Sequence, residues 1–545
     1  MQSKLIWEYQ RTDCIHSAAD AKELLLANRS LNSSADFLTP PEPLQLSPQD
    51  VGLDQKKLIK AAKIISTAVA NKQKILLFGD YDVDGVCATA IMWEAIRELG
   101  ALAQPFIPHR LKHGYGLSIK ALEEIWASNK PDLVITVDNG IVAHAALAWL
   151  AEHHVPVILT DHHQPDGKKI EAEVLIHSTQ VCGAAVAWFL AREIAPTAAA
   201  AQLDLLGLAT LADQMPLIGS NRAFALYGLQ ALDKTTRAGL LALKKVAQIN
   251  GPITSQAAQF GLIPRLNAMG RLEHGLISLR LVCVRDRDRA AQLADQLQST
   301  NTDRQQLTYD LQAAALTQAE QQQAEKIIIV QSENFHEGVI GLLAGKLLET
   351  VYKPVIALQI GSKTAKASVR SVPGFDIIQF LRNQQLPFLE LGGHALAAGF
   401  LVATETVPEV VAGLHAAARQ AISDELLIPR LRLEAKLAIS ALSIELVEVI
   451  NLFQPFGQAN PVPVFGIESL ELRDVMTLGS NQQHLKLVLA DESGKSVTGL
   501  FWKRGELLSE LQVGKQYSVA AKLELNEWRG KQRVQLIISD LKALD

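Results

Sequence analysis

Short apolar runs alternate with amphipathic stretches in the first half of the chain. The runs at Ile75–Phe78, Leu133–Val137 and Val155–Leu159 contain no charged residue, and a polar turn and a helical pattern follow each of them. Uncharged runs of this length are typical of strands buried on both faces, and strands that alternate with helices form parallel sheets. The pattern predicts a parallel-sheet α/β domain whose first helix extends from about Val86 to Leu99.

The pattern changes twice further along the chain. Residues 201–325 are rich in Ala, Leu and Gln and predict a helical spacer. A second α/β domain is predicted from Lys326–Val330, with a helix start at Gly338 and a strand near Pro354–Leu358. We expect this domain to end near residue 425.

The last eighty residues show alternation that is typical of short strands. Their predicted order is β-β-β-α-β-β, which is the order of an OB-fold barrel, a frequent binder of single strands and oligosaccharides. The predicted elements lie at 467–472, 485–489, 497–501, 505–511, 517–523 and 533–538.

The first fifty residues end in Thr39–Pro43, whose three prolines exclude a helix interior or a central strand. We interpret residues 1–48 as an arm that docks on the domain that follows. The predicted division is the arm at 1–48, the first α/β domain at 49–220, the helical spacer at 221–325, the second α/β domain at 326–425, and a linker with the barrel at 426–545.

Composition narrows the class of protein. The 545 residues carry 52 basic and 57 acidic side chains, a net charge of −5, so any nucleic-acid contact must use a local basic groove. The four cysteines form no CxxC pair, which argues against a disulfide scaffold or zinc ribbon and favours a reducing compartment. No apolar run reaches 18 residues and no secretion signal is recognisable, so we expect a cytoplasmic protein without membrane contact.

Acidic residues and histidines follow the three predicted strands of the first domain. Asp80, Asp82 and Asp84 come after the first strand, Asp138 after the second, and His162 after the third. Ligands of open parallel sheets bind beyond the carboxyl ends of the strands, so we expect these side chains in one crevice. Carboxylates this close require cations, and carboxylates with one or two imidazoles suit Mn²⁺ or Mg²⁺ better than zinc.

Two such ions about 3.5–4 Å apart would activate a water and neutralise a phosphoryl oxygen. Asp213, at the end of an apolar run, is a candidate for completing the shell of the second ion. The sequence from Asp80 also resembles an EF-hand loop, but its twelfth position is Ile91, where a bidentate Glu is required. A solvated acidic turn explains a single Asp-x-Asp more easily than it explains three strand ends that each carry Asp.

Seven short motifs follow one another along the chain: Asp80–Gly85, Val137–Gly140, Asp161–His163, Arg265–Arg271, His336–Gly341, Gly392–His394 and Pro455–Pro461. In this order they resemble the DHH phosphoesterase superfamily, and within it the bacterial exonucleases that degrade single-stranded DNA from the 5′ end. The resemblance covers about residues 50–545, and it identifies the first α/β domain as the DHH catalytic domain and the second as the DHH-associated substrate-binding domain.

The resemblance implies two sets of functional residues. The implied two-metal centre consists of Asp80, Asp82, Asp84, Asp138, His162 and Asp213, with His163 as a further catalytic residue and Asp161 as an orienting neighbour. The implied substrate-phosphate contacts are Arg110, Arg271, His336, Ser368, Arg370, Gly392, Gly393 and His394. Three places depart from the pattern: the loop Ala367–Ser371 lacks the glycines of the family, Ala459 replaces a glycine, and Phe335 stands where the family often has Trp.

The resulting hypothesis is a single-stranded-DNA-specific 5′→3′ exonuclease that releases 5′-mononucleotides in DNA repair and recombination. We expect a monomer, with a helicase and a single-strand binding protein as candidate partners. In the barrel, the candidates for stacking or phosphate contact are Trp502, Trp528, Lys503 and Arg504. Two alternatives remain: a related phosphodiesterase acting on oligonucleotides or cyclic dinucleotides, and a non-catalytic replication scaffold.

Overall fold

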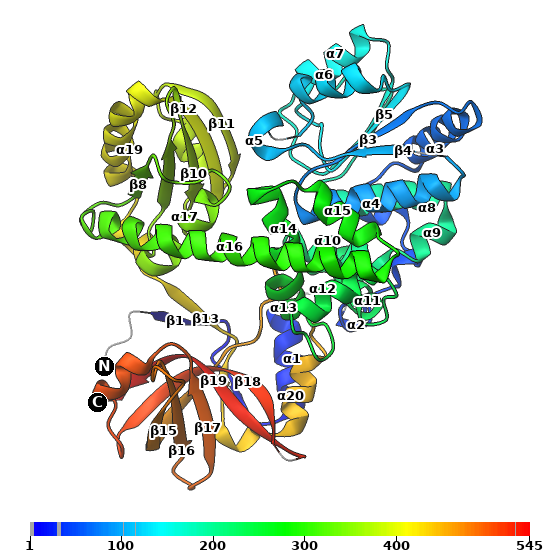
Figure 1. Cartoon of the computed structure of the whole chain (residues 1–545). Coiled ribbons are helices and arrows are strands. Elements are labelled where there is room, and N and C mark those ends of the chain that lie inside the picture. Colours follow the sequence, from blue (N-terminus) through cyan, green and yellow to red (C-terminus); the bar gives the residue numbers. More distant parts are fainter. Residues whose placement is uncertain (1–4, 30–33, 102, 115, 529, 545) are drawn as a thin grey trace. The chain divides into compact units, whose positions relative to one another are not determined.

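The computed structural model describes residues 5–29, 34–101, 103–114, 116–528 and 530–544 (Figure 1). The chain divides into two units. One comprises Ala35–Asp310 and Pro455–Asn460, and the other comprises Met1–Ser34, Leu311–Gln454 and Pro461–Asp545. The short segment Pro455–Asn460 therefore belongs with residues more than 140 positions before it.

The first unit is built on a parallel sheet of order β4-β3-β5-β6-β7, as the apolar runs predict. Alternate residues of β3 face opposite helix layers: Ile75 and Leu77 pack in the core formed with α4 and α8, whereas Leu76 and Phe78 pack against α6 and α7 (Figure 1). The strands are β3 (Ile75–Phe78), β4 (Ala103–Phe106), β5 (Leu133–Val137), β6 (Val157–Asp161) and β7 (Val174–His177), and the helices around them are α3 (Gln55–Ala70), α4 (Val83–Glu98), α5 (Arg110–His113), α6 (Ile119–Ser128), α7 (His144–Glu152) and α8 (Gly183–Ile194).

Two details of this sheet differ from the prediction. The edge strands β4 and β7 were not predicted; β4 contains Pro105 and is only partly buried, as edge strands tolerate. Helix α4 begins at Val83 rather than near Val86, because Asp82 caps it by accepting a hydrogen bond from the Gly85 amide at 3.0 Å. The earlier start places Asp84 in the first helical turn.

The predicted helical spacer is confirmed as a run of helices. Helices α10 and α11 approach closely at Gly207 and Gly228, where added Cβ atoms would overlap the facing backbone. The helices are α9 (Pro196–Ala200), α10 (Leu203–Ala212), α11 (Gly219–Asp233), α12 (Ala238–Val246), α13 (Ser255–Ala257), α14 (Ile263–Leu272), α15 (Leu276–Cys283) and the long α16 (Arg287–Glu320).

The second α/β domain contains a mixed sheet of order β11-β12-β10-β9-β8. Strands β8 and β9 are parallel, and β10, β12 and β11 continue the sheet in antiparallel fashion. The elements are β8 (Ile328–Ser332), α17 (Ile340–Val351), β9 (Val355–Ile360), β10 (Thr364–Arg370), α18 (Ile377–Arg382), β11 (Phe388–His394), β12 (Ala397–Ala403) and α19 (Val407–Ala421).

The C-terminal strands form the closed barrel that their predicted order indicates. The long β15 pairs with β18 and, from Glu471 onward, also with β16, which closes the sheet; a bulge between Leu472 and Asp474 interrupts the pairing with β16. Its elements are α20 (Ile444–Asn451), β15 (Phe465–Leu478), β16 (His484–Ala490), β17 (Ser496–Phe501), the 3₁₀ turn Gly505–Glu510, β18 (Gln516–Trp528) and β19 (Lys531–Ala543).

The prediction that the whole arm docks on the following domain is wrong for its first part. Strand β1 (Ile6–Tyr9) pairs in parallel with β13 (Arg430–Leu433), and β2 (Cys14–Ile15) pairs with β14 (Lys436–Leu437). Helix α1 (Ala18–Asn28) follows, and its Asn28 donates to the Glu434 carboxylate at 2.7 Å. Only the later part of the arm packs on the following domain, where Arg192 donates to the Leu46 carbonyl at 2.8 Å. Pairing across 420 residues leaves no local signal in the sequence.

Candidate metal centre

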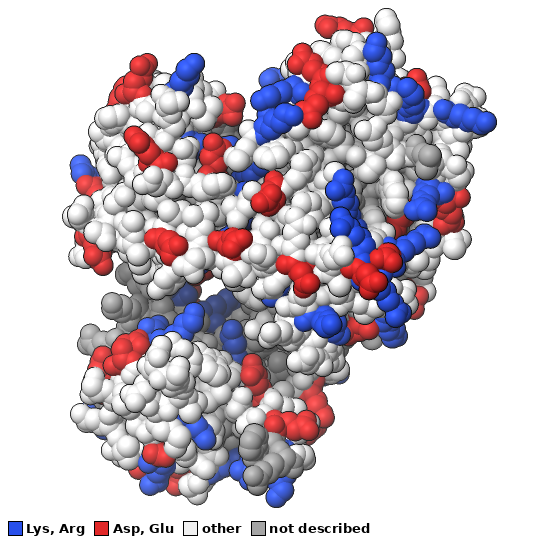
Figure 2. Space-filling model, in the orientation of Figure 1, with Lys and Arg blue, Asp and Glu red and all other residues white. Residues whose placement is uncertain are grey.

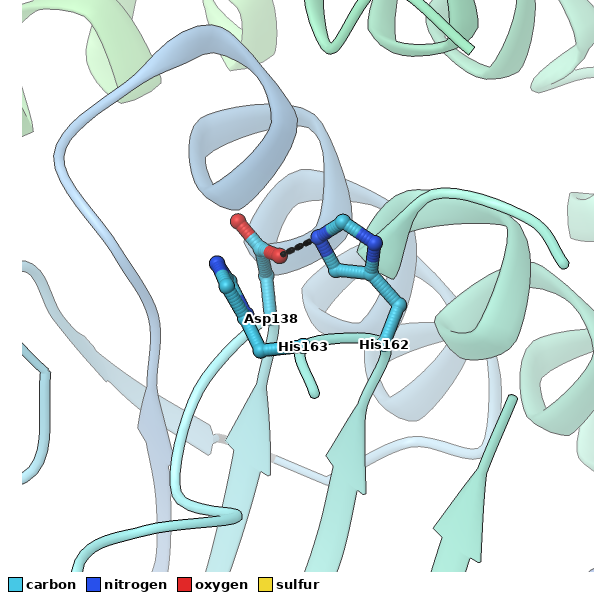
Figure 3. Close-up of side chains that lie close together, drawn as sticks. All are labelled: Asp138, His162 and His163. Atoms are coloured by element: carbon cyan, nitrogen blue, oxygen red, sulfur yellow. Dashed lines mark ion pairs between the residues drawn. The ribbon is translucent and has the colours of Figure 1, made fainter. Parts of the chain in front are cut away.

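The carboxyl ends of β3, β5 and β6 bring the predicted aspartates and histidines together, as the strand-end rule predicts. Figure 3 shows the Asp138 carboxylate between the rings of His162 and His163, and the distances place His162 close to three carboxylates. Its Nε2 is 3.2 Å from Asp138 Oδ1 and 3.7 Å from Asp84 Oδ2, and its Nδ1 is 3.7 Å from Asp213 Oδ2. Residues that are up to 129 positions apart in the chain therefore meet around one imidazole.

Asp84 is held by the beginning of a second helix. Its two carboxylate oxygens accept hydrogen bonds from the amides of Gly183 and Ala184, at 2.7 and 2.8 Å, in the first turn of α8. The unpaired amides and the dipole at a helix N-terminus favour a negative charge. Gly183 has a second role, because a Cβ at this position would overlap the Asp138 side chain.

Asp138 adopts a backbone conformation that non-glycine residues rarely use. Its φ is +63°, directly after β5, while its amide still donates to the Thr160 carbonyl at 3.1 Å. Such left-handed residues are uncommon and concentrate at functional sites. This turn directs the Asp138 carboxylate toward His162 (Figure 3).

Asp161 holds the backbone of His162 and His163 and the ring of His163 through hydrogen bonds. It accepts hydrogen bonds from the amides of Ile141, His162 and His163 at 2.7–3.1 Å, and its Oδ1 is 2.7 Å from His163 Nδ1. Burial is the largest single effect and opposes the charged imidazole, but the hydrogen bond to Asp161 and the negative charges of Asp161, Asp80 and Asp84 together outweigh it and raise the pKa of His163 to about 9. This bond uses Nδ1 of His163 and fixes the orientation of its ring.

Ionisation of the carboxylates of this centre is unfavourable when no cation is bound. Burial, followed by the charge of neighbouring aspartates, raises the pKa of Asp80 to about 8 and those of Asp84 and Asp213 to about 7. The same causes raise the pKa of Asp138 well above its usual range. Among the described residues, the buried Asp80 Oδ1 and Asp138 Oδ1 accept no hydrogen bond, and Asp138 Oδ1 makes only the 3.2 Å ion-pair contact with His162 Nε2. Buried acceptors of this kind fit divalent cations, which would restore the ionised form.

The candidate ligand atoms fall into three sets, and two of these are separate from each other. Asp84, His162 and Asp213 form one set, and Asp80, Asp82 and Asp138 form the other; within each set one ligand atom per residue lies within 4.8 Å of the others. The two sets share no residue and together use all six predicted metal ligands. Asp138, His162 and His163 form a third, overlapping set. One separate set offers three carboxylates, and the other offers two carboxylates and one imidazole. Both suit Mn²⁺ or Mg²⁺.

Two predicted arginines lie near the segment Asp80–Asp84 that follows β3, which we call the acidic loop. The Arg110 guanidinium lies over the Tyr81 ring, 5.3 Å from its centroid, and its charge acts on Asp80. The charge of Arg271 acts on the Tyr81 hydroxyl. Helix α14, which carries Arg271, is fixed to the loop because the Val83 amide donates to Asn267 Oδ1 at 3.1 Å.

The contact made by Asn267 was not foreseen. Asn267 falls within a motif that the sequence analysis singled out, but nothing local indicates its partner. Gly270 is required at the same crossing, because a Cβ there would overlap the Tyr81 carbonyl. The only local signal is a polar residue and a glycine in a helix that otherwise combines apolar residues with two arginines.

The remaining predicted residues gather in the second unit, on one face of the mixed sheet. The strand register places Ser368, Gly399 and Gly392 in one row across β10, β12 and β11, and Arg370, Ala397 and His394 in the next row on the same face. Rows of the opposite face, such as Ala367 and Phe400, are buried in the core. We call the surface formed by Ser368, Arg370, Gly392, His394, Ala397 and Gly399 the open face.

The N-terminus of α17 lies beside this open face. A Cβ on Gly341 would approach Ser368 Oγ to 3.0 Å and Arg370 Nη2 to 3.1 Å. His336 precedes the helix, and its Nδ1 accepts from the Gly338 amide at 3.0 Å. Gly393 has a φ of +139°, and a Cβ there would overlap the backbone of Ala397. The structure thus groups His336, Ser368, Arg370 and the Gly392–His394 segment.

A parallel sheet that gathers aspartates with a histidine pair, followed by a mixed sheet that carries Gly-Gly-His, defines a DHH-type phosphoesterase. Comparison with family models agrees: the DHH family N-terminal domain matches residues 74–212 and the DHHA1 domain matches residues 324–424. A third model, the RecJ OB domain, matches residues 433–540.

Comparison with individual proteins narrows the class. The single-stranded-DNA-specific exonuclease RecJ of Bacillus subtilis is 31% identical over 99% of this chain and 71% of the relative. The chain belongs to the RecJ family. A crystal structure of Thermus thermophilus RecJ in complex with Mn²⁺ superimposes with a TM-score of 0.85 at 28% identity, over 100% of this chain and 80% of that one. The Mg²⁺ complex of the same protein gives 0.79 at 27% identity, over 100% and 79%.

Divalent metal ions are the cofactors that this centre and these relatives have in common. Among the described residues, no helix has both the length and the apolar character needed to cross a membrane.

Proposed function

We propose that this chain is a metal-dependent exonuclease that degrades single-stranded DNA from the 5′ end and releases 5′-mononucleotides. The observation that carries the proposal is the convergence of six ligand side chains into two separate sets at one sheet edge. Strand specificity is supported by the single-stranded-DNA-specific relatives, and the 5′→3′ polarity is what the resemblance of the motifs to this family implies. Roles in DNA repair and recombination are consistent with that activity.

The proposed roles divide between the two sets and their supports. Asp84, His162 and Asp213 hold one divalent ion, and Asp80, Asp82 and Asp138 hold the other. When bound, two such ions supply the positive charge that neutralises a phosphoryl oxygen and a water of lowered pKa. The chain itself contributes orientation: Asp161 fixes the His163 ring, and the first turn of α8 fixes Asp84.

Phosphate contacts are proposed for both units. Arg110 and Arg271 lie near the acidic loop, and a guanidinium can bind two phosphate oxygens at once. On the open face, Arg370 and Ser368 offer a cation and a hydroxyl, while the glycines of the row leave space for a phosphate group. His336 would contribute Nε2, because its Nδ1 already accepts from Gly338.

A groove on the barrel supports a path for the DNA. A hollow of about 1010 Å³ follows β16, β17 and the β18–β19 hairpin, the surface on which OB folds bind oligonucleotides. The described residues that line it include four basic side chains, Lys486, Lys495, Lys531 and Arg533, and no acidic side chain; Lys495 donates to the Ser440 carbonyl at 3.0 Å. On the face that Figure 2 shows, basic and acidic side chains are otherwise interspersed, in keeping with the net charge of −5.

The sequence-predicted candidates in the barrel lie elsewhere. Trp502 is 48% exposed and stacks edge-on against His484, with centroids 4.7 Å apart, but neither it nor Lys503 or Arg504 lines this groove. The side chain of Trp528 lies outside the described part of the structure.

A substrate panel tests the proposal. A long 5′-phosphorylated single strand, the matching duplex, short RNA oligomers and a cyclic dinucleotide are incubated with the protein and Mn²⁺, and products are resolved by length. The expected result is mononucleotides from the 5′ end of the single strand. Preference for the short substrates would favour the related phosphodiesterases, and DNA binding without cleavage would favour the non-catalytic scaffold.

We further propose the partners and division of labour that the sequence suggests. An enzyme that consumes single strands requires strand separation, which makes a helicase and a single-strand binding protein the expected partners in the cytoplasm. We propose a monomer that uses residues 49–220 for catalysis, 221–325 as spacer, 326–425 for substrate binding and 426–545 for DNA binding, with 1–48 as the arm. Light scattering of the full chain tests the monomer.

A further inference from the structure

A turn from late in the sequence lies in the unit that contains the metal centre. Residues Pro455–Asn460 belong to that unit, whereas the residues on both sides of them belong to the other. The turn is closed by reciprocal backbone hydrogen bonds between Gly457 and Asn460, at 2.9 and 3.1 Å, and by Asn460 Nδ2, which donates to the Pro455 carbonyl at 2.9 Å. Asn460 is fully buried, so the turn is an integral part of this unit.

The turn contacts one loop of the catalytic domain. The Leu217 amide donates to the Gln458 carbonyl at 2.8 Å, and a Cβ on Gly457 would lie 2.8 Å from Leu217 Cδ1. Leu217 is 1% exposed, so an amide without this partner would lose a buried hydrogen bond. One helical turn further along, the buried Arg222 reaches the Pro455 carbonyl at 3.5 Å.

The loop that the turn contacts carries Asp213. Asp213 ends α10, and its amide donates to the Ala209 carbonyl at 2.9 Å. Gln214 follows at a φ of +53°, a conformation that costs free energy for a residue with a side chain. Only three residues separate Asp213 from Leu217, so a shift at Leu217 is transmitted to the carboxylate that faces His162 Nδ1 at 3.7 Å.

We infer that the turn Pro455–Asn460 is a positioning element for Asp213, and through it for the set Asp84, His162 and Asp213. This inference rests on the proposed function, in which that set holds one of two divalent ions. The turn acts through Leu217 and touches no reacting atom. It predicts that a change more than 240 residues after Asp213 alters one metal site and leaves the other intact.

The test is Gly457→Val in the full chain, with Mn²⁺ binding measured by electron paramagnetic resonance titration. The added side chain displaces the turn from Leu217. Outer-shell changes weaken metal binding by about 10–100-fold. We therefore expect two Mn²⁺ sites in the parent chain and, in the variant, one site weakened by about tenfold and one unchanged. The matched control is Ala459→Gly, which relaxes a φ of +60° in the same turn and should bind both ions as the parent does.

A compensating variant separates positioning from general destabilisation. In Gly457→Val combined with Leu217→Ala, the smaller residue makes room for the larger one, and the second site should regain most of its affinity. If Gly457→Val fails to fold, this double variant serves as the test, and parent-like binding of two ions supports the inference.

Three outcomes would overturn the inference. They are parent-like binding by a folded Gly457→Val variant, equal weakening of both sites, and a folded double variant that stays weakened at the second site. Failure of the proposed function would look different, because the parent chain itself would then bind no Mn²⁺ or would cleave no single-stranded DNA.

Discussion

The parallel sheet presents its candidate residues at one edge, whereas the mixed sheet presents them along one face. At the edge, Asp80, Asp138 and His162 each follow a different strand and are largely buried. On the open face, Ser368 and Arg370 lie within β10, and the row continues onto Gly392 and His394 of β11, which are exposed. The first arrangement concentrates charge, and the second spreads polar groups over a surface.

The sheet edge and the open face differ in whether they need bound cations before substrate binds. The buried carboxylates repel one another and have raised pKa values, so the metal centre is incomplete without cations. The open face carries one guanidinium, which already hydrogen-bonds the Val369 carbonyl at 2.8 Å and Ser368 Oγ at 3.3 Å. We therefore expect substitutions at the edge to remove activity and substitutions on the open face to weaken substrate binding.

The largest effect is expected from Asp138→Asn. The amide keeps the shape and tolerates the positive φ but lowers the negative charge that holds a cation. Loss of about 4 kcal/mol of transition-state stabilisation corresponds to about 10³-fold in kcat. Because the change also removes a repelled buried carboxylate, the melting temperature of the metal-free protein should not fall. Nuclease assays and calorimetry check both results, and activity within tenfold of the parent would exclude the centre from catalysis.

A smaller effect is expected from Asp161, which hydrogen-bonds His163 and is not itself one of the proposed metal ligands. Asp161→Asn removes the charge that orients His163, and we expect metal affinity or kcat to fall by about 10–100-fold. The matched control is Asp166→Asn, which alters another aspartate–histidine pair, with His144 Nε2 at 3.0 Å, away from the centre. Mn²⁺ titration of activity distinguishes them; equal behaviour of the two variants would show that Asp161 does not support the centre.

The open face should respond in binding rather than in turnover. Arg370→Ala removes a phosphate-binding cation, and we expect KM for single-stranded DNA to rise about tenfold, about 1.4 kcal/mol, with little change in kcat. Steady-state kinetics over a range of DNA concentrations measure the two parameters separately. If kcat falls as far as it does in Asp138→Asn, the distinction between edge and face is wrong.

The smallest effect is expected in the barrel groove, where the basic side chains are spread along several strands. Replacing Lys486, Lys531 and Arg533 together by Ala removes three of the four cations of its lining and leaves Lys495. For single strands each phosphate contact contributes about −0.7 to the slope of log K against log salt concentration, so the slope should become shallower by about 2. The control is Lys503→Ala with Arg504→Ala, outside the groove. An unchanged slope in the triple variant would place the DNA elsewhere on the barrel.

Much of this centre could be predicted from the sequence because the rule that locates it is local. An uncharged run of four or five residues indicates a buried parallel strand, and the polar residues that follow the run lie at the edge where ligands bind. Asp80, Asp138 and His162 could be placed in this way. The edge strand β4 could not, since Pro105 and partial burial remove the signal that marks a central strand.

Contacts between distant segments were decided by the tertiary structure alone. The amides of α8 that hold Asp84, the Asn267 that fixes the acidic loop, and the turn at Pro455–Asn460 beside Leu217 all join residues about 100 to 240 positions apart. The pairing of β1 with β13 spans still more of the chain. Hydrophobic periodicity records which face of an element is buried, but it does not record which other element covers that face. The identity of that partner depends on chain closure over long separations, and only the folded structure specifies it.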